Sequence, residues 1–194
     1  MDVPSDRHRR RFTGFAFPRS AVSNGGIYAW QDGRENCDTF TTILEYGPEN
    51  NPKKGFQVVF SSRQTNSARG NVENYHSTIG TIDVIKGTVS NEGVEKAKVE
   101  TKQLAQTEVA ATAANTGAGG MEVAHMRNWM ECIRARKQPN APIEAGYSHA
   151  VALIMSNASL RTGRKATFDA KSRQVLAGGK VFRGYEKNDG FWFF

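Results

Sequence analysis

The chain has 194 residues, 38% of them hydrophobic, with a formal net charge of +7 and a sequence pI near 9.6. This length accommodates one domain, or one domain with a small appendage, and the mean hydropathy of −0.56 indicates polar arms or long loops around a modest core. No apolar run approaches the roughly 20 residues of a membrane span. The basic charge suggests nucleic acid as a partner. However, it is concentrated in RHRRR at residues 7–11 and is otherwise scattered, so nucleic-acid binding is disfavoured.

The two cysteines, Cys37 and Cys132, are far apart in the sequence and form no C-x-x-C motif. Two cysteines do not make a disulfide framework. We interpret them as free thiols in a reducing compartment, which predicts a cytoplasmic protein.

In chain order, residues 1–14 are basic and lack hydrophobic periodicity, which predicts a disordered tail. Residues 20–31 are interpreted as a turn at Asn24–Gly26 followed by a short apolar stretch. Two strands are predicted next, over 39–46 and 56–62, because both are rich in β-branched and aromatic residues. Turn residues separate them, so we predict an antiparallel hairpin with a long loop.

Two further short strands are predicted within residues 76–90, on either side of Gly80, because IGTIDV has the β-branched density of a buried strand. From residue 92 to about 120 the chain is rich in Lys, Glu, Gln, Thr and Ala and ends in NTGAGG. We interpret this segment as a polar excursion and linker.

Two helices are predicted over 121–136 and 145–161, and a short last strand over 165–170. The first helix has one apolar stripe at spacings of 3, 4 and 3, made of Val123, Met126, Met130 and Ile133. Strands followed by helices predict an α+β fold: an open, mostly antiparallel sheet with helices packed on one face. We therefore expect one α+β domain over 15–182 and an aromatic C-terminal tail over 183–194.

A search for catalytic motifs finds none. GAGGME at 117–122 departs from the G-x-G-x-x-G dinucleotide fingerprint and follows no strand, so it is interpreted as a hinge. The four histidines show no metal-ligand spacing, and no nucleophile elbow is present. Acidic side chains before the first long strand are possible general acids or bases, but ordinary turn chemistry explains them equally well; they are Asp32, Glu35 and Asp38.

Several stretches together resemble a known family. These are GGIYAWQDGRENCDTFTTILEYG, GFQVVFSSRQTN, STIGTIDVIKG and HMRNWMECIRARKQPNAPIEAGYSHAVALIMSNASLRTGRKATFD. They resemble the C-terminal domain of the Gfo/Idh/MocA oxidoreductases, the glucose-fructose oxidoreductase and inositol dehydrogenase group. The resemblance covers about residues 18–170, and the block H-x-x-N-x-x-x-C-I-R-x-R-K-x-P-N is its most specific part.

The resemblance implies an open sheet backed by helices that covers a sugar or polyol and forms a homo-oligomer through the open sheet face. In that family a separate Rossmann domain binds NAD(P) and carries the lysine of an E-K-P motif. This sequence has no glycine fingerprint and no E-K-P lysine. The resemblance therefore implies a non-catalytic half with no cofactor of its own, from a truncated or split gene or a fragment. It also allows pairing with a separate Rossmann half. The alternative is a non-enzymatic homo-oligomeric interaction module.

If any residues of this chain face a substrate, we expect them to be Arg34, His125, Asn128, Tyr147 and His149. Each also has a structural interpretation: Tyr147 fits the apolar stripe of its helix, for example, and Asn128 suits a polar helix position. No catalytic, cofactor-binding or metal-binding residue is predicted. DGRENCDTF, at residues 32–40, is interpreted as a structural turn at the rim of the domain, with Arg34 and Glu35 expected near a substrate in the whole enzyme.

Overall fold

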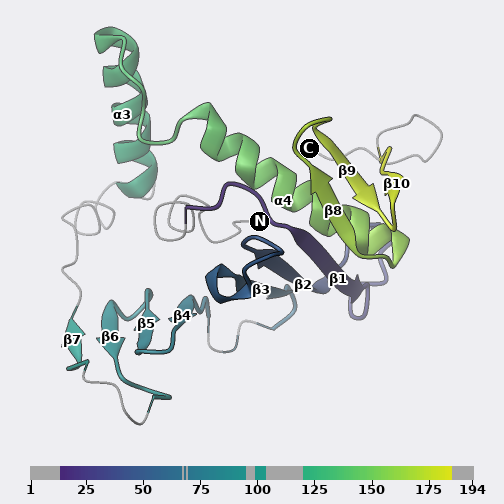
Figure 1. Cartoon of the computed structure of the whole chain (residues 1–194), viewed down its shortest axis with the longest axis horizontal. Coiled ribbons are helices and arrows are strands. Elements are labelled where there is room, and N and C mark those ends of the chain that lie inside the picture. The colour runs from purple at the N-terminus through teal and green to yellow at the C-terminus, as the bar shows by residue number, and fades with distance from the viewer. Residues whose placement is uncertain (1–13, 67, 69, 95–98, 104–119, 185–194) are drawn as a thin grey trace. The chain divides into compact units, whose positions relative to one another are not determined.

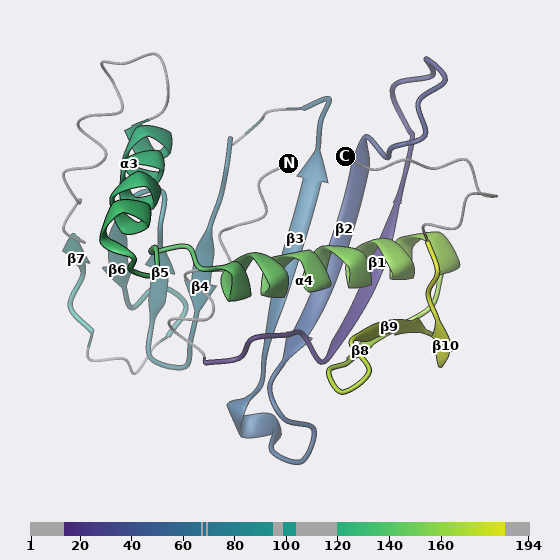
Figure 2. The same cartoon turned by 90° about the horizontal axis from the view of Figure 1, so that it is seen from above.

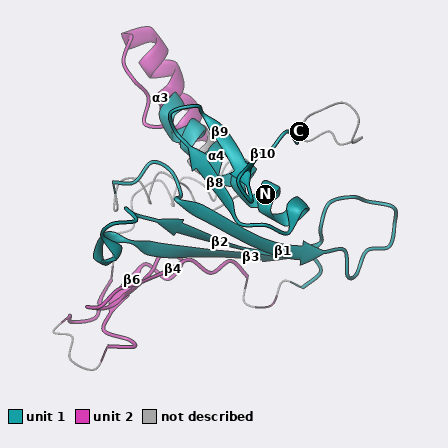
Figure 3. Cartoon of the chain, turned by 45° about the vertical axis from the view of Figure 1, so that its right-hand side comes forward, with its two compact units in different colours: residues 1–67, 143–194 teal, residues 68–142 magenta. Residues whose placement is uncertain are grey.

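The computed structural model describes residues 14–66, 68, 70–94, 99–103 and 120–184. Most of both predicted tails and most of the predicted polar excursion lie outside these residues. The chain divides into two compact units, residues 1–67 with 143–194 and residues 68–142 (Figure 3). A single domain over 15–182 stays a prediction.

The first unit is built on a six-stranded sheet in which every neighbouring pair is antiparallel (Figures 1 and 2). The order across the sheet is β10-β9-β8-β1-β2-β3. The strands are β1 (Ser20–Gly26), β2 (Thr39–Tyr46), β3 (Phe56–Arg63), β8 (Ala166–Asp169), β9 (Gln174–Ala177) and β10 (Lys180–Val181). The predicted strands at 39–46, 56–62 and 165–170 are confirmed, whereas β9 and β10 were not predicted.

The predicted hairpin of β2 and β3 is confirmed, with an unbroken register from Thr39↔Arg63 to Tyr46↔Phe56 and a short 3-10 helix, η1 (Pro52–Lys54), in its loop. The predicted turn at Asn24–Gly26 is wrong, because these residues form the end of β1 and pair with β2. A Cβ at Gly25 would lie 2.5 Å from the Cβ of Phe40. Glycine is therefore needed here for close approach of two strands, and not for chain reversal.

One face of this sheet is covered by α4 (Ile143–Thr162), which packs over β1, β8 and β9 and touches β2 (Figure 2). The helix begins two residues before its predicted start, just after Pro142, and ends before Gly163, whose positive φ of 64° suits a helix C′ position. The core between helix and sheet consists of Ala21, Leu44, Tyr46, Val151, Ala152, Met155, Ala158, Ala166, Val175 and Ala177.

The opposite face of the sheet carries no helix of this unit among the described residues. Val22, Ile43 and Val59 lie directly opposite one another on β1, β2 and β3, and are 48%, 38% and 64% exposed. A cluster of charges lies at one side of this row, where Glu45 accepts a hydrogen bond from Ser20 Oγ at 2.5 Å and pairs with Lys165 Nζ at 3.3 Å. We call this surface the open face.

The second unit contains a four-stranded antiparallel sheet in the order β4-β5-β6-β7. Its strands are β4 (Asn74–His76), β5 (Thr81–Asp83), β6 (Thr88–Ser90) and β7 (Lys102–Gln103). The sequence predicted two strands around Gly80, and the structure has three in that region. Among the described residues of this unit only Gly80 and Thr81 are buried, and Thr81 Oγ1 donates to the carbonyl of Glu92 at 3.0 Å.

The second unit also contains α3 (Gly120–Ala135), which confirms the predicted helix at 121–136 to within a residue at each end. Its predicted apolar stripe is exposed along its whole length, at Val123, Met126, Met130 and Ile133. Two helices with open antiparallel sheets confirm the α+β class. No helix in the described part of the chain combines the length and apolar character needed to cross a membrane.

Candidate functional site

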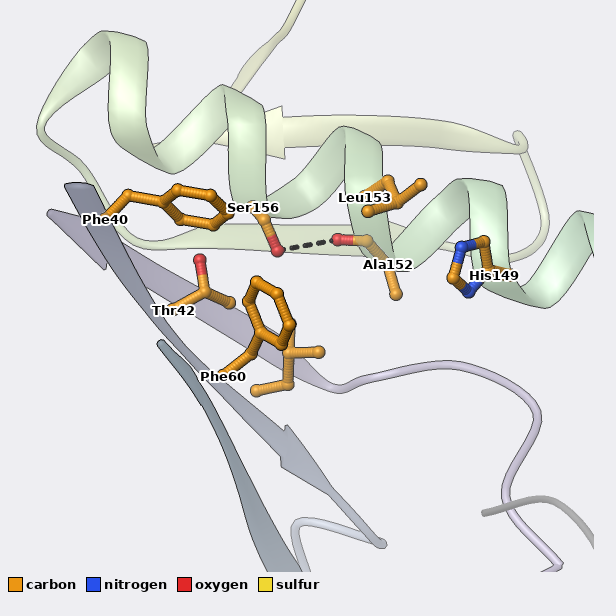
Figure 4. Close-up of a pocket in the computed structure, with 8 residues that line it drawn as sticks. Phe40, Thr42, Phe60, His149, Ala152, Leu153 and Ser156 are labelled. Atoms are coloured by element: carbon orange, nitrogen blue, oxygen red, sulfur yellow. Dashed lines mark hydrogen bonds between the residues drawn. The ribbon is translucent and has the colours of Figure 1, made fainter. Parts of the chain in front are cut away.

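A small cavity lies between α4 and the strands β2 and β3, on the helix-covered face of the first unit (Figure 4). Alternate residues of β2 face the helix, and positions i, i+3, i+4 and i+7 of α4 share the helix side that faces β2. The cavity has a volume of about 30 Å³. Its walls are Phe40, Thr42, Leu44, Phe60, His149, Ala152, Leu153 and Ser156.

The walls of this cavity are mostly apolar, and the hydroxyls of Ser156 and Thr42 are already hydrogen-bonded. The rings of Phe40 and Phe60 lie 5.5 Å apart, and Ser156 Oγ donates to the carbonyl of Ala152 at 2.8 Å. The hydroxyl of Thr42 hydrogen-bonds to that of Ser23. His149 is the one titratable side chain among the lining residues, so no acid–base pair is assembled there. About 30 Å³ accommodates little more than a water molecule, whereas pockets for small molecules have about 300–1,000 Å³.

Arg34 lies in the loop between β1 and β2 and is held by two neighbours. Its Nε donates to Asp32 Oδ1 at 2.7 Å, and its guanidinium lies 4.1 Å from the centre of the Trp30 ring. The hydrogen bonds from Arg34 lower the pKa of Asp32 to about 2. Arg34, which the sequence predicts as a substrate contact, is therefore a preorganised cation. Its Nε and one terminal nitrogen are hydrogen-bonded to Asp32.

Asp38 shapes this same loop from inside. Its carboxylate accepts the backbone N–H groups of Tyr28, Ala29 and Trp30, with the shortest distance 2.7 Å at Ala29, and it is 1% exposed. Hydrogen bonds to the charged form lower its pKa to about 2, those from Ala29 most of all. Asp38 therefore has the environment of a structural anion, because a general acid or base requires a pKa nearer neutrality. This supports the interpretation of DGRENCDTF as a structural turn.

Tyr147 and His149 both lie on α4 but point to different sides of it, because residues two apart on a helix do not face each other. Tyr147 is 41% exposed and packs edge-on against Phe17, with ring centres 5.5 Å apart, and against Phe168 at 6.4 Å. Of the two, only His149 lines the cavity (Figure 4).

The other two predicted contacts, His125 and Asn128, belong to the second unit. His125 is exposed on α3, whereas Asn128 holds the chain after the helix: its Oδ1 accepts the N–H of Asn140 at 2.8 Å. The thiol of Cys132 donates to the carbonyl of Gln138 at 3.5 Å in the same place. This explains the block H-x-x-N-x-x-x-C in structural terms, as a clamp on the segment after α3.

The structure therefore does not assemble the five predicted residues into one site within the first unit. The cavity residues that the prediction missed are Phe40, Thr42, Phe60 and Ser156. The signal for them was in the sequence: Phe40 and Thr42 share the parity of Leu44, and Ser156 follows His149 at a spacing of seven. No group of three or more His, Cys, Asp or Glu residues that could hold a metal is found in the part of the chain described.

Comparison with solved structures finds a crystal structure described as a "putative oxidoreductase" from Bacteroides fragilis. It aligns with 84% of this chain at a TM-score of 0.52 and 12% sequence identity. The chain spans about half of that structure's length, 49%. The TM-score indicates a similar fold. At 12% identity the alignment shows the fold alone. No protein-family model and no curated protein matches the chain.

Proposed function

We propose that this chain is the substrate-binding and oligomerisation half of an NAD(P)-dependent oxidoreductase of the Gfo/Idh/MocA type, acting on a sugar or polyol. The observation that carries the proposal is the alignment of 84% of the chain with about half of an oxidoreductase-like chain. The four stretches that resemble the C-terminal domain of that family are a second, sequence-based support. They include residues 32–46, which form the β1–β2 loop and β2, and residues 125–140, which include the clamped end of α3.

The described residues do not fit the cofactor of such an enzyme. The sequence has no glycine fingerprint to hold a pyrophosphate. The cavity of about 30 Å³ is too small for a dinucleotide or a sugar, so the proposed substrate contacts lie outside it. The proposal therefore assigns NAD(P), and with it the hydride chemistry, to a Rossmann half outside these residues, on a longer polypeptide or a separate chain.

Within the proposed half, the open face is the surface for homo-oligomerisation. Its row of Val22, Ile43 and Val59 is flanked by the hydrogen-bonded hydroxyls of Thr41 and Ser61, which are 3.0 Å apart. An apolar row with a polar rim is typical of a surface that associates. Val22→Lys is expected to lower the mass in light scattering, and Asn50→Lys in the β2–β3 loop is the control of equal charge.

A second candidate function is a homo-oligomeric interaction module with no enzymatic role. It is favoured by the size of the cavity, which is too small for a sugar. It shares the open face with the first proposal and differs from it in binding no small molecule.

The experiment that tests the proposed function is a ligand titration of the full chain followed by amide NMR, with myo-inositol, glucose, NADH and NADPH as separate probes. We expect saturable shifts with a polyol or sugar at Arg34 and Tyr147, predicted contacts that do not line the small cavity, and no binding of either nucleotide. Arg34→Ala is expected to weaken binding at least tenfold, whereas the control Arg63→Ala, at an exposed arginine of β3, leaves it unchanged. Micromolar binding of a nucleotide would overturn the proposal. An oligomer that binds none of the four probes would favour the interaction module.

A further inference from the structure

The residues just before β1, 14–19, are anchored to other elements of the first unit, and we call them the strap. The ring centre of Phe15 lies 6.3 Å from that of Phe56 on β3. At the other end of the strap, the backbone N–H of Arg19 donates to the carbonyl of Glu45 on β2 at 2.6 Å. The strap is therefore fixed to strands that are distant from it in the sequence.

The second aromatic residue of the strap, Phe17, contacts the start of α4. Its ring centre lies 5.5 Å from that of Tyr147, edge-on, and 4.8 Å from that of Phe168 on β8. The rings of Tyr147 and Phe168 lie 6.4 Å apart, so side chains from three elements form one aromatic cluster. Aromatic pairs at such distances attract each other beyond the effect of the area that they bury. Because Tyr147 opens the second turn of α4, the strap holds this helix near its beginning.

Other features of the first two turns of α4 weaken them. Gly146 lies inside the helix, where glycine is less favourable than alanine. Ser148 is 1% exposed, and its hydroxyl has no hydrogen-bond partner among the described residues, which opposes folding of the segment that carries it. His149 borders the small cavity, so packing beside it is incomplete. The later turns of α4 differ, because Val151 and Met155 are buried in the core.

We propose that the strap is a latch on the first two turns of α4. While Phe17 is docked on Tyr147, residues 143–150 are helical. When the strap leaves, these residues unfold with it as one cooperative unit, and the rest of α4 stays folded. A segment of this length spans about 12 Å as a helix and up to about 26 Å when extended. Because the second unit ends at Pro142, opening the latch lengthens this connection between the two units.

Thiol labelling of the full chain measures this opening. Ser148→Cys and Ser159→Cys place one thiol near each end of α4, at serines that are each 1% exposed. The two free cysteines are replaced in every variant, by Cys37→Ser and Cys132→Ser. Without denaturant, we expect Ser148→Cys to react at least about tenfold faster than Ser159→Cys, because the local opening exposes it. Equal rates would show that α4 opens only as a whole and would overturn the proposal.

Substitutions in the strap and in the helix identify the latch. Phe17→Ala is expected to raise the labelling rate of Ser148→Cys about tenfold. Gly146→Ala is expected to lower that rate about fivefold, and its added Cβ meets nothing within 4 Å.

The control is Met155→Ala, which truncates the core beyond the latch. It is expected to speed the labelling of Ser159→Cys and to leave that of Ser148→Cys unchanged. Circular dichroism checks that each variant is folded. An unchanged rate at Ser148→Cys in the Phe17→Ala chain, or a faster one in the Met155→Ala chain, would each overturn the latch.

Discussion

The two units of this chain contain the same kinds of element but differ in what they bury. In the first unit α4 and the six-stranded sheet enclose a core in which Met155 and Ala158 are fully inaccessible. In the described part of the second unit, α3 and the turn between β4 and β5 leave large apolar side chains exposed, among them Trp129, Ile133 and Ile79. A periodic apolar pattern therefore predicts that a helix forms and does not predict how much of it is buried, because burial depends on a tertiary partner.

The comparison is tested most strongly by truncating one methionine in each helix. Met155 of α4 is 0% exposed, and Met155→Ala is expected to lower the free energy of unfolding by about 2–5 kcal/mol. Met130 of α3 is 42% exposed, and Met130→Ala is expected to change it by less than about 0.5 kcal/mol. Urea denaturation of both variants measures the difference. Equal losses would show that α3 is buried in solution and would remove the contrast between the units.

The next largest effect is expected in the loop before β2. Asp38→Asn weakens the acceptor of three backbone N–H groups and is expected to lower the urea midpoint at pH 7. Hydrogen bonds lower the pKa of Asp38 to about 2, below the ordinary 3.8. Its stabilisation is therefore complete above pH 4 and is lost as the pH falls through 2. The difference in urea midpoint between Asp38→Asn and the unmodified chain should shrink as the pH falls from 4 to 2. Asp32→Asn, at a 53% exposed carboxylate, is the control and should have the smaller effect.

In the second unit, Asn128→Ala sharpens the comparison because it removes the clamp after α3. Loss of the bond from Asn140 is expected to cost about 0.5–1.5 kcal/mol of local stability. Amide hydrogen exchange measures this loss: we expect faster exchange at Asn140 and unchanged exchange in α4. Asn128→Asp keeps an acceptor and should retain most of the protection. A global loss of stability would mean that the two units unfold together.

The smallest effect is expected at the open face. Glu45 lies between Ser20, Lys165 and Arg19, and these hydrogen bonds lower its pKa to about 2 from 4.5. The contribution is complete above pH 4.5 and disappears as the pH falls toward 2. Because the carboxylate is 27% exposed and its cations are more exposed still, Glu45→Gln should cost less than about 1 kcal/mol at pH 7. Urea denaturation of Glu45→Gln and of the unmodified chain measures this cost. If their free energies of unfolding still differ at pH 2, the contribution of Glu45 is not electrostatic.

Long elements with strong patterns were predictable from the sequence. β2, β3, α3 and α4 each have several turns or residue pairs of consistent periodicity, and the structure confirms all four. β1 was missed because Asn24, Gly25 and Gly26 have turn chemistry, whereas the structure needs Gly25 for the close approach of Phe40. β9 and β10 were missed because strands of four and two residues carry too little pattern.

The candidate site was predicted less well than the fold. His149 was named and does line the cavity, but Phe40 and Phe60 were not, because a cavity wall depends on which strand lies under which helix residue. Asn128 was named as a polar contact and proves to bind Asn140. A side chain that hydrogen-bonds twelve residues along the chain has no local sequence pattern of its own. The substrate roles of the five predicted residues stay predictions.

The stacking of Arg34 on Trp30 also gives the molecule an optical consequence. Trp30 lies in the first unit beneath a guanidinium, and Trp129 lies in the second unit, 47% exposed to water. The third tryptophan, Trp192, lies outside the described residues. A Trp192→Phe chain therefore contains one tryptophan in each unit, with emission expected at different wavelengths because the two indoles have different surroundings. Unfolding of the two halves can then be followed separately in one cuvette, without any attached label.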